Sequence, residues 1–158
     1  MKNQFLKIIP ILLKSPLFKN LGAEEIPLFL ESVNGSVKKY GKGEAVLHSG
    51  QFTENLGFVV SGRVQVENMD FWGNRSILDS ISQGMVFAET YALMPDMPLF
   101  VDVTSCESSE ILFMNMELAL KSRFSSVIMQ NLLEISLRKN LVLSQRIFCT
   151  SPRTIRGK

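Results

Sequence analysis

Residues 56–67 read LGFVVSGRVQVE and contain two strand-like runs joined by a short turn. Residues 56–60 form the first run, and residues 63–67 form the second. The second run alternates strictly between polar and apolar side chains, which is the period of a β-strand. Ser61 and Gly62 lie between the runs, and glycine adopts positive φ angles at low cost. This stretch predicts a β-hairpin.

Short strand-like runs continue on both sides of this hairpin. They are residues 37–40, 45–48, 75–81, 99–104 and 110–114. Glycines mark the turns between them, at Gly41, Gly43, Gly50, Gly62, Gly73 and Gly84. Short strands separated by glycine turns at regular intervals are typical of a sandwich or barrel. We therefore predict a mainly β fold with flanking helices.

Residues 83–103, QGMVFAETYALMPDMPLFVDV, interrupt this rhythm. Residues 88–93 are long enough for a short helix, and Pro95 and Pro98 force a loop after it. A helical turn with free backbone N–H groups between two strands can hold an anion. The same sequence also fits an irregular corner of a β-fold, and both interpretations stay open.

Helical patterns lie at both ends of the chain. We expect helical pieces within residues 8–18, 23–33 and 116–121, and a long helix from Ser125 or Ser126 to about Arg146. One apolar stripe of the long helix comprises Ile128, Leu132, Ile135 and Val142, and Leu133, Leu137 and Leu141 form another flank. So wide an apolar helix predicts two partners, its own domain and a second copy of the chain. Packing on its own domain alone is the other interpretation.

The composition indicates a single globular domain with an appendage. The chain has 158 residues, of which 46% are apolar and 20% charged, with a net charge of +2. No acidic residue follows Glu134, so the C-terminal segment is basic, either as a solvated helix face or as a segment that approaches DNA. The two cysteines, Cys106 and Cys149, are too few for a disulfide framework. No run approaches the ~20 apolar residues of a membrane span, so we expect a soluble, cytoplasmic protein.

Catalytic and metal-binding motifs are missing from the sequence. His48 is the single histidine, which is too few for a jelly-roll metal site, and no P-loop or Gly-x-Ser-x-Gly motif occurs. We therefore expect no enzyme activity, no metal and no cofactor. Glu89 can act as a ligand acceptor or can cap local backbone N–H groups.

Three spaced motifs resemble the cyclic-nucleotide-binding β-roll. They are Gly43-x-x-Val46-x-x-x-Gly50, then Phe58-Val59-Val60-Ser61-Gly62-Arg63-Val64-x-Val66, then Gly84-x-x-Phe87-x-Glu89. With the long helix that follows, the chain is similar to bacterial Crp/Fnr transcription regulators. The resemblance implies a double-stranded β-helix, or jelly roll, with a long C-terminal dimerisation helix. It divides the chain into helices and effector domain (1–122), dimerisation helix (123–148), and a hinge that opens a missing winged helix-turn-helix domain (149–158).

The chain departs from this family at two effector positions. Members that bind cyclic AMP carry a glycine where this chain has Ala88, and a phosphate-pairing arginine where it has Leu99. Without that arginine a buried phosphate lacks its charge-assisted contact. We therefore predict no useful cyclic AMP binding and an unknown effector that is more apolar than cyclic AMP. The predicted ligand-binding residues are Phe87, Ala88, Glu89, Thr90, Leu99 and Phe100. Iron–sulfur and haem members fit poorly, because cysteines are few and His48 is a weak axial ligand.

The leading hypothesis is the effector-sensing and dimerisation domain of a Crp/Fnr-type transcription regulator. Its partners would be a second copy, held through Ile128, Leu132, Ile135 and Val142, and a small effector. DNA would be bound only by the full-length protein, and no membrane is expected. The alternative is a stand-alone regulatory or interaction module with a vestigial pocket.

Overall fold

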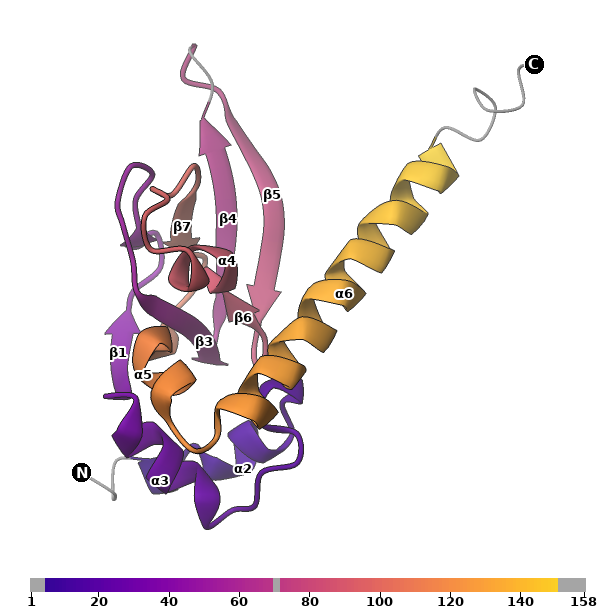
Figure 1. The fold of residues 1–158 in the computed structure, drawn as a ribbon. Helices are drawn as coiled ribbons and strands as arrows, with labels where there is room; N and C mark the ends of the chain where they lie inside the picture. Colours follow the sequence, from indigo (N-terminus) through magenta and orange to yellow (C-terminus); the bar gives the residue numbers. More distant parts are fainter. Residues whose placement is uncertain (1–4, 70–71, 151–158) are drawn as a thin grey trace.

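The computed structural model describes residues 5–69 and 72–150, with residues 69 and 139–150 as backbone only. Its strands form two four-stranded antiparallel sheets, with the orders β1-β8-β3-β6 and β2-β7-β4-β5 (Figure 1). The strands are β1 (Ser36–Tyr40), β2 (Ala45–Leu47), β3 (Asn55–Ser61), β4 (Arg63–Met69), β5 (Arg75–Ser82), β6 (Val86–Phe87), β7 (Asp102–Ser105) and β8 (Ser109–Asn115). The predicted mainly β jelly roll with flanking helices is confirmed.

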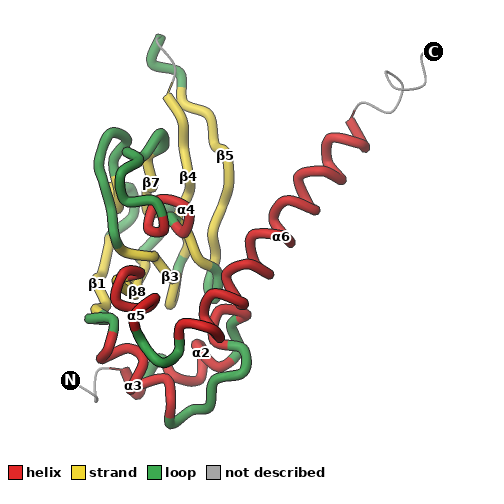
Figure 2. Tube along the Cα trace, in the orientation of Figure 1, coloured by secondary structure: helices red, strands yellow, loops and turns green. Residues whose placement is uncertain are grey.

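Short helices cover one end of the roll, and one long helix leaves it (Figures 1 and 2). The helices at that end are α2 (Ile9–Leu13), η1 (Pro16–Phe18), α3 (Glu25–Ser32) and α5 (Met116–Lys121), and the long helix is α6 (Ser125–Thr150). The short helix α4 (Glu89–Leu93) is not one of them and lies between β6 and β7 in the chain. Pro16 separates α2 from η1, as expected from its effect on the preceding residue. The Ser15 side chain caps η1 by accepting a hydrogen bond from the Leu17 N–H, at 3.1 Å. No helix of the described residues is long and apolar enough to cross a membrane.

The turn between β3 and β4 requires a glycine. Gly62 has a φ of +87°. A Cβ atom there would lie 2.6 Å from the Ser108 carbonyl oxygen and would also strike the Ser109 side chain. Ser109 contacts this turn directly, because its Oγ accepts a hydrogen bond from the Arg63 N–H at 3.1 Å. Both the backbone angle and the available space therefore exclude other residues at Gly62.

The first sheet separates two apolar clusters. Alternate residues of β3 and β8, including Phe58 and Leu112, enter an outer cluster between the sheet and the helices. Their neighbours, including Val59 and Ile111, enter an inner cluster between the two sheets. Strand β3 is buried on both faces, which explains why its sequence is apolar without alternation.

The start of α6 is anchored in the outer cluster. Ile128 and Leu132 are both buried there. The buried Asn131 side chain donates two hydrogen bonds to η1 and its neighbour, to the carbonyl oxygens of Leu17 (2.7 Å) and Lys19 (2.8 Å). The C-terminal part of the helix stands clear of the roll (Figure 1).

The helix faces differ from those expected for the dimer contact. Ile128 and Leu132 pack inside the chain's own domain, and Ile135 packs partly against it. The Val142 side chain lies outside the described residues. Among the described side chains of α6, Leu133 and Leu137 are the large apolar ones that are exposed, with exposed fractions of 61% and 53%. The buried stripe follows the alternative prediction, packing on the chain's own domain. Among the described side chains of α6, the flank with Leu133 and Leu137 is the one left for a dimer contact.

One strand boundary was wrong. We expected a strand from residue 99, but β7 begins at Asp102. Leu99 instead joins a loop, where its N–H donates to the Gln51 carbonyl (2.8 Å) and its own carbonyl accepts from the Gly50 N–H (2.7 Å). These two bonds hold the loop against residues 50–51, and strand pairing starts only after them.

Candidate functional site

Residues 83–103, the cassette, form the corner of the roll that the sequence singles out. Short strand β6 leads into α4, and Ala88 is the residue between them. Ala88 has a φ of 63° and a ψ of 19°, which is the left-handed conformation that glycine adopts more easily. The helix α4 follows at Glu89 and ends at Leu93, close to the expected helix at 88–93.

Phe87 fills the inside of the roll. Its ring lies against Gly57 of β3, which is its partner in the strand register. The ring also packs edge-on to Phe113, with centroids 6.4 Å apart. A side chain at position 57 would strike this ring, so Gly57 makes the space that Phe87 occupies.

Leu99 occupies the position where the family resemblance placed a phosphate-binding arginine. Its side chain is 2% exposed and belongs to the inner cluster. The buried members of this cluster are apolar: Leu47, Val59, Val64, Ile81, Phe87, Leu99, Val103, Ile111 and Phe113. Packed apolar side chains therefore fill the space between the two sheets beside the cassette.

The remaining predicted ligand residues lie in different environments. Glu89 is half-buried in the first turn of α4, where the helix dipole favours a carboxylate. Thr90 is exposed, and Phe100 is 64% exposed with its ring edge-on to Tyr91. None of the predicted ligand residues lines either of the two cavities described next.

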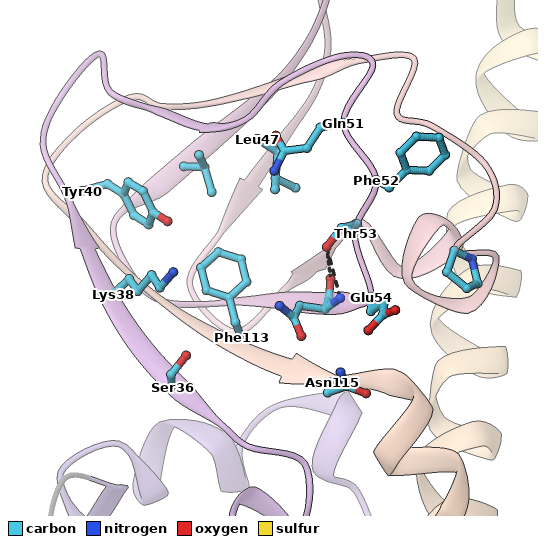
Figure 3. A pocket seen from close by; sticks show the side chains of 13 residues that line it. Ser36, Lys38, Tyr40, Leu47, Gln51, Phe52, Thr53, Glu54, Phe113 and Asn115 are labelled. Carbon is cyan, nitrogen blue, oxygen red and sulfur yellow. Dashed lines mark hydrogen bonds between the residues drawn. The ribbon is translucent and has the colours of Figure 1, made fainter.

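A polar cavity of about 460 Å³ opens at the mouth of the roll (Figure 3). Its lining is Ser36, Lys38, Tyr40, Val46, Leu47, Gln51, Phe52, Thr53, Glu54, Asn55, Pro95, Phe113 and Asn115. The Lys38 ammonium lies 5.7 Å from the centre of the Phe113 ring. Burial, and after it the charge of Glu44, raises the pKa of the Tyr40 hydroxyl, which keeps this side chain a neutral donor.

A second and larger cavity, the groove, has a volume of about 900 Å³. It lies between the N-terminal helices, strand β5 with its following turn, and α6. Its lining is Ile11, Lys14, Ser15, Pro16, Leu78, Asp79, Ser80, Gln83, Gly84, Met85, Val86, Ile135 and Arg138. The sequence did not predict the groove, although Met85 belongs to the cassette and Pro16 marks the break between α2 and η1.

Metal-binding and nucleophilic groups are not assembled in the part of the chain that the structure describes. No group of three or more His, Cys, Asp or Glu side chains is placed to hold a metal there. Burial raises the pKa of the Cys106 thiol, the Arg63 charge lowers it to a smaller extent, and the charges of Glu107 and Glu67 raise it further. A raised pKa favours the protonated thiol, which is a poor nucleophile.

The sequence matches the family model for the cyclic nucleotide-binding domain over residues 37–122, which is more than half of the chain. The chain belongs to this family. The matched part of the domain contains the complete roll from β1 to β8 and α5. No functionally curated protein matches the sequence.

Solved structures with this domain's fold include regulators. Catabolite activator protein from Thermus thermophilus is 24% identical, with a TM-score of 0.73 over 87% of this chain and 63% of its own. The sensor domain of the transcriptional regulator DNR from Pseudomonas aeruginosa is 20% identical, with a TM-score of 0.71 over 93% and 95% of the two chains. The regulatory subunit of a cAMP-independent protein kinase A from Trypanosoma brucei is 15% identical, with a TM-score of 0.67 over 89% and 47%.

The comparisons confirm the cyclic-nucleotide-binding roll that the sequence motifs predicted. This domain spans less than two thirds of the Thermus protein, so that protein's additional parts have no counterpart in these 158 residues. At these identities the likeness extends to the fold, and function has to be argued from the site itself.

Proposed function

We propose that the domain is the effector-sensing and dimerising part of a transcription regulator, and that its effector is not cyclic AMP. The observation that carries this proposal is the burial of Leu99 in the inner cluster. A cyclic phosphate beside the cassette would displace packed apolar side chains. The desolvated phosphate would need a guanidinium to compensate its charge, and the side chain at this position is the apolar Leu99.

Dimerisation through α6 is part of this proposal. Two observations support it: Leu133 and Leu137 are exposed and lie four residues apart, so they share one face of the helix. A second copy that packs on this face would bury both, and the C-terminal part of the helix stands free of the roll (Figure 1). We place the dimer contact on this flank, with Ile135 at its edge, while Ile128 and Leu132 hold the helix to its own domain.

The remaining roles follow the regulator proposal. The domain acts by binding and not by catalysis, in a cytoplasmic setting, and DNA is contacted by a further domain of a longer protein. The basic residues after Glu134 agree with a segment that approaches DNA. The division into 1–122, 123–148 and 149–158 stays a prediction of this proposal.

Calorimetric titration of the purified 158-residue chain with cyclic AMP and cyclic GMP tests the effector part. We expect no binding with a sub-millimolar dissociation constant for either nucleotide. Binding of either one below that limit contradicts this part of the proposal.

Sedimentation tests the dimer part. We expect Leu133→Glu to shift the chain from dimer to monomer, because a carboxylate would be buried in the contact. Leu120→Glu is the matched control, because Leu120 is an exposed leucine that belongs to α5 and not to α6. A wild-type monomer, or equal effects of the two variants, would favour the stand-alone module with a vestigial pocket.

A further inference from the structure

The groove lies where three parts of the domain meet. Ile11 to Pro16 supply one wall, Leu78 to Val86 supply the second, and α6 supplies the third through Ile135 and Arg138. Its volume of about 900 Å³ lies in the range of cavities that bind small organic molecules. It is separate from the inner cluster, so its space does not depend on opening the roll.

Apolar side chains from all three walls line this groove. They are Ile11, Leu78, Met85, Val86 and Ile135. Leu78 is 53% exposed on the edge strand β5, and Met85 is also an exposed apolar side chain. Single exposed apolar residues are common, but this set shares one concave surface. The groove therefore favours a ligand with an apolar body, and methionine adapts to different shapes.

Two cations border these apolar walls. Lys14 is the C-terminal cap residue of α2 and Arg138 belongs to α6, and both are exposed. Within the described residues, neither side chain forms a hydrogen bond or an ion pair. The one carboxylate in the lining, Asp79, already accepts a hydrogen bond from the Ser80 N–H at 2.8 Å. The lining is therefore positive in balance, and its cations are available to an anion.

We propose that the groove binds a small amphipathic monocarboxylic acid as the effector. Lys14 and Arg138 hold the carboxylate, and Leu78, Met85 and Ile135 cover the apolar body. A guanidinium and an ammonium both form charge-assisted hydrogen bonds to a carboxylate. This inference rests on the proposed sensor function and gives its effector a chemical class and a place.

The same geometry couples the ligand to α6. Asn131 fixes the helix to η1, and Arg138 lies seven residues later, about 10 Å further along the axis. The Ser15 hydroxyl joins η1 to the turn before β6 by donating to the Gly84 carbonyl, at 3.2 Å. A carboxylate held between Lys14 and Arg138 would draw the helix toward the roll beyond this fixed point. A ligand that binds one helix position better shifts the population toward it.

Titration of the full chain with decanoate tests the proposal, at concentrations below micelle formation. The comparison ligands are 1-decanol, which keeps the apolar body without the charge, and acetate, which keeps the charge without the body. We expect decanoate to bind at least about tenfold more tightly than either, because charged hydrogen bonds and apolar burial both contribute.

Variants identify the residues responsible. Lys14→Gln and Arg138→Gln should each weaken decanoate binding roughly tenfold, while Lys42→Gln, which removes an exposed cation on the β1–β2 turn, should leave it unchanged. Met85→Ser should weaken both decanoate and decanol. Circular dichroism and melting of each variant verify that it is folded.

Three outcomes would overturn the inference. They are equal binding of decanoate and decanol, equal effects of Lys42→Gln and Arg138→Gln, and no decanoate binding at all. If decanoate does not bind while Met85→Glu converts a dimer into a monomer, a second copy occupies the groove instead. In each case the regulator proposal still holds if the chain is a dimer and does not bind cyclic nucleotides. Failure of the groove proposal can therefore be told apart from failure of the regulator proposal.

Discussion

Ala88 sets the geometry of the cassette at the scale of one residue. Its φ of 63° lies in the left-handed region, where an L-residue is disfavoured by roughly 1–2 kcal/mol. The family resemblance places a glycine here, which would adopt this angle without strain. The backbone at Ala88 therefore has the conformation that glycine prefers.

Ala88→Gly should raise the free energy of unfolding by about 1 kcal/mol, because it relieves this strain. Denaturation in urea, followed by circular dichroism, measures the change. Ala92→Gly provides the matched control, since Ala92 lies buried within α4, where glycine is unfavourable. Loss of stability in both variants would show that the backbone at residue 88 is not strained.

Gly57 supports the second residue-scale prediction. Gly57→Ala should lower the free energy of unfolding by about 1–3 kcal/mol, since the new methyl group strikes the Phe87 ring. Gly41→Ala is the control, where a Cβ atom would meet only the Glu44 carboxylate at 3.8 Å. Adding Phe87→Leu to Gly57→Ala should recover part of the loss. Equal stability of the two alanine variants would exclude the contact.

The start of α6 depends on one buried amide at the scale of the element. Asn131→Ala would leave the carbonyl oxygens of Leu17 and Lys19 without their donors. We expect a loss of about 1–3 kcal/mol, because the buried Leu17 oxygen loses its donor, whereas the bond to the exposed Lys19 is only partly buried. Gln130→Ala is the control, because Gln130 is exposed on the same helix. Thermal melting compares the two, and similar melting temperatures would argue against the anchor.

The sequence predicted the elements whose apolar residues follow a clear pattern, but it did not predict what those elements pack against. The run at residues 56–60 and the alternation at 63–67 gave β3 and β4, and the long apolar pattern after Ser125 gave α6. The same pattern did not tell which flank of α6 is buried. That choice depends on the hydrogen bonds between Asn131 and the carbonyl oxygens of Leu17 and Lys19. These partners are 114 and 112 residues away in the sequence.

The candidate site was harder to predict for a similar reason. Leu99 could be placed from its spacing after Glu89, and its burial agrees with the expected loss of phosphate binding. The groove brings together Lys14, Met85 and Arg138, which belong to three separate elements. The sequence pattern within one element does not show which residues of distant elements lie side by side. Only the three-dimensional structure shows that these three residues line one groove.

The whole molecule should open unevenly under native conditions. Strand β3 pairs on both sides and is buried on both faces, whereas β5 is an edge strand with an exposed face. Hydrogen exchange should therefore protect the β3 amides most and the β5 amides that face away from β4 least. Mass spectrometry of exchanged peptides from the two strands measures this order. Equal protection would mean that the roll opens only as a unit.

The two apolar clusters lie on opposite faces of one sheet and have no side chain in common. Substitutions in the inner cluster do not change the side chains of the outer cluster against which Ile128 and Leu132 of α6 pack. Inner residues such as Leu99 can therefore be substituted without removing the contacts that hold the start of α6. The architecture lets ligand preference evolve while assembly is kept.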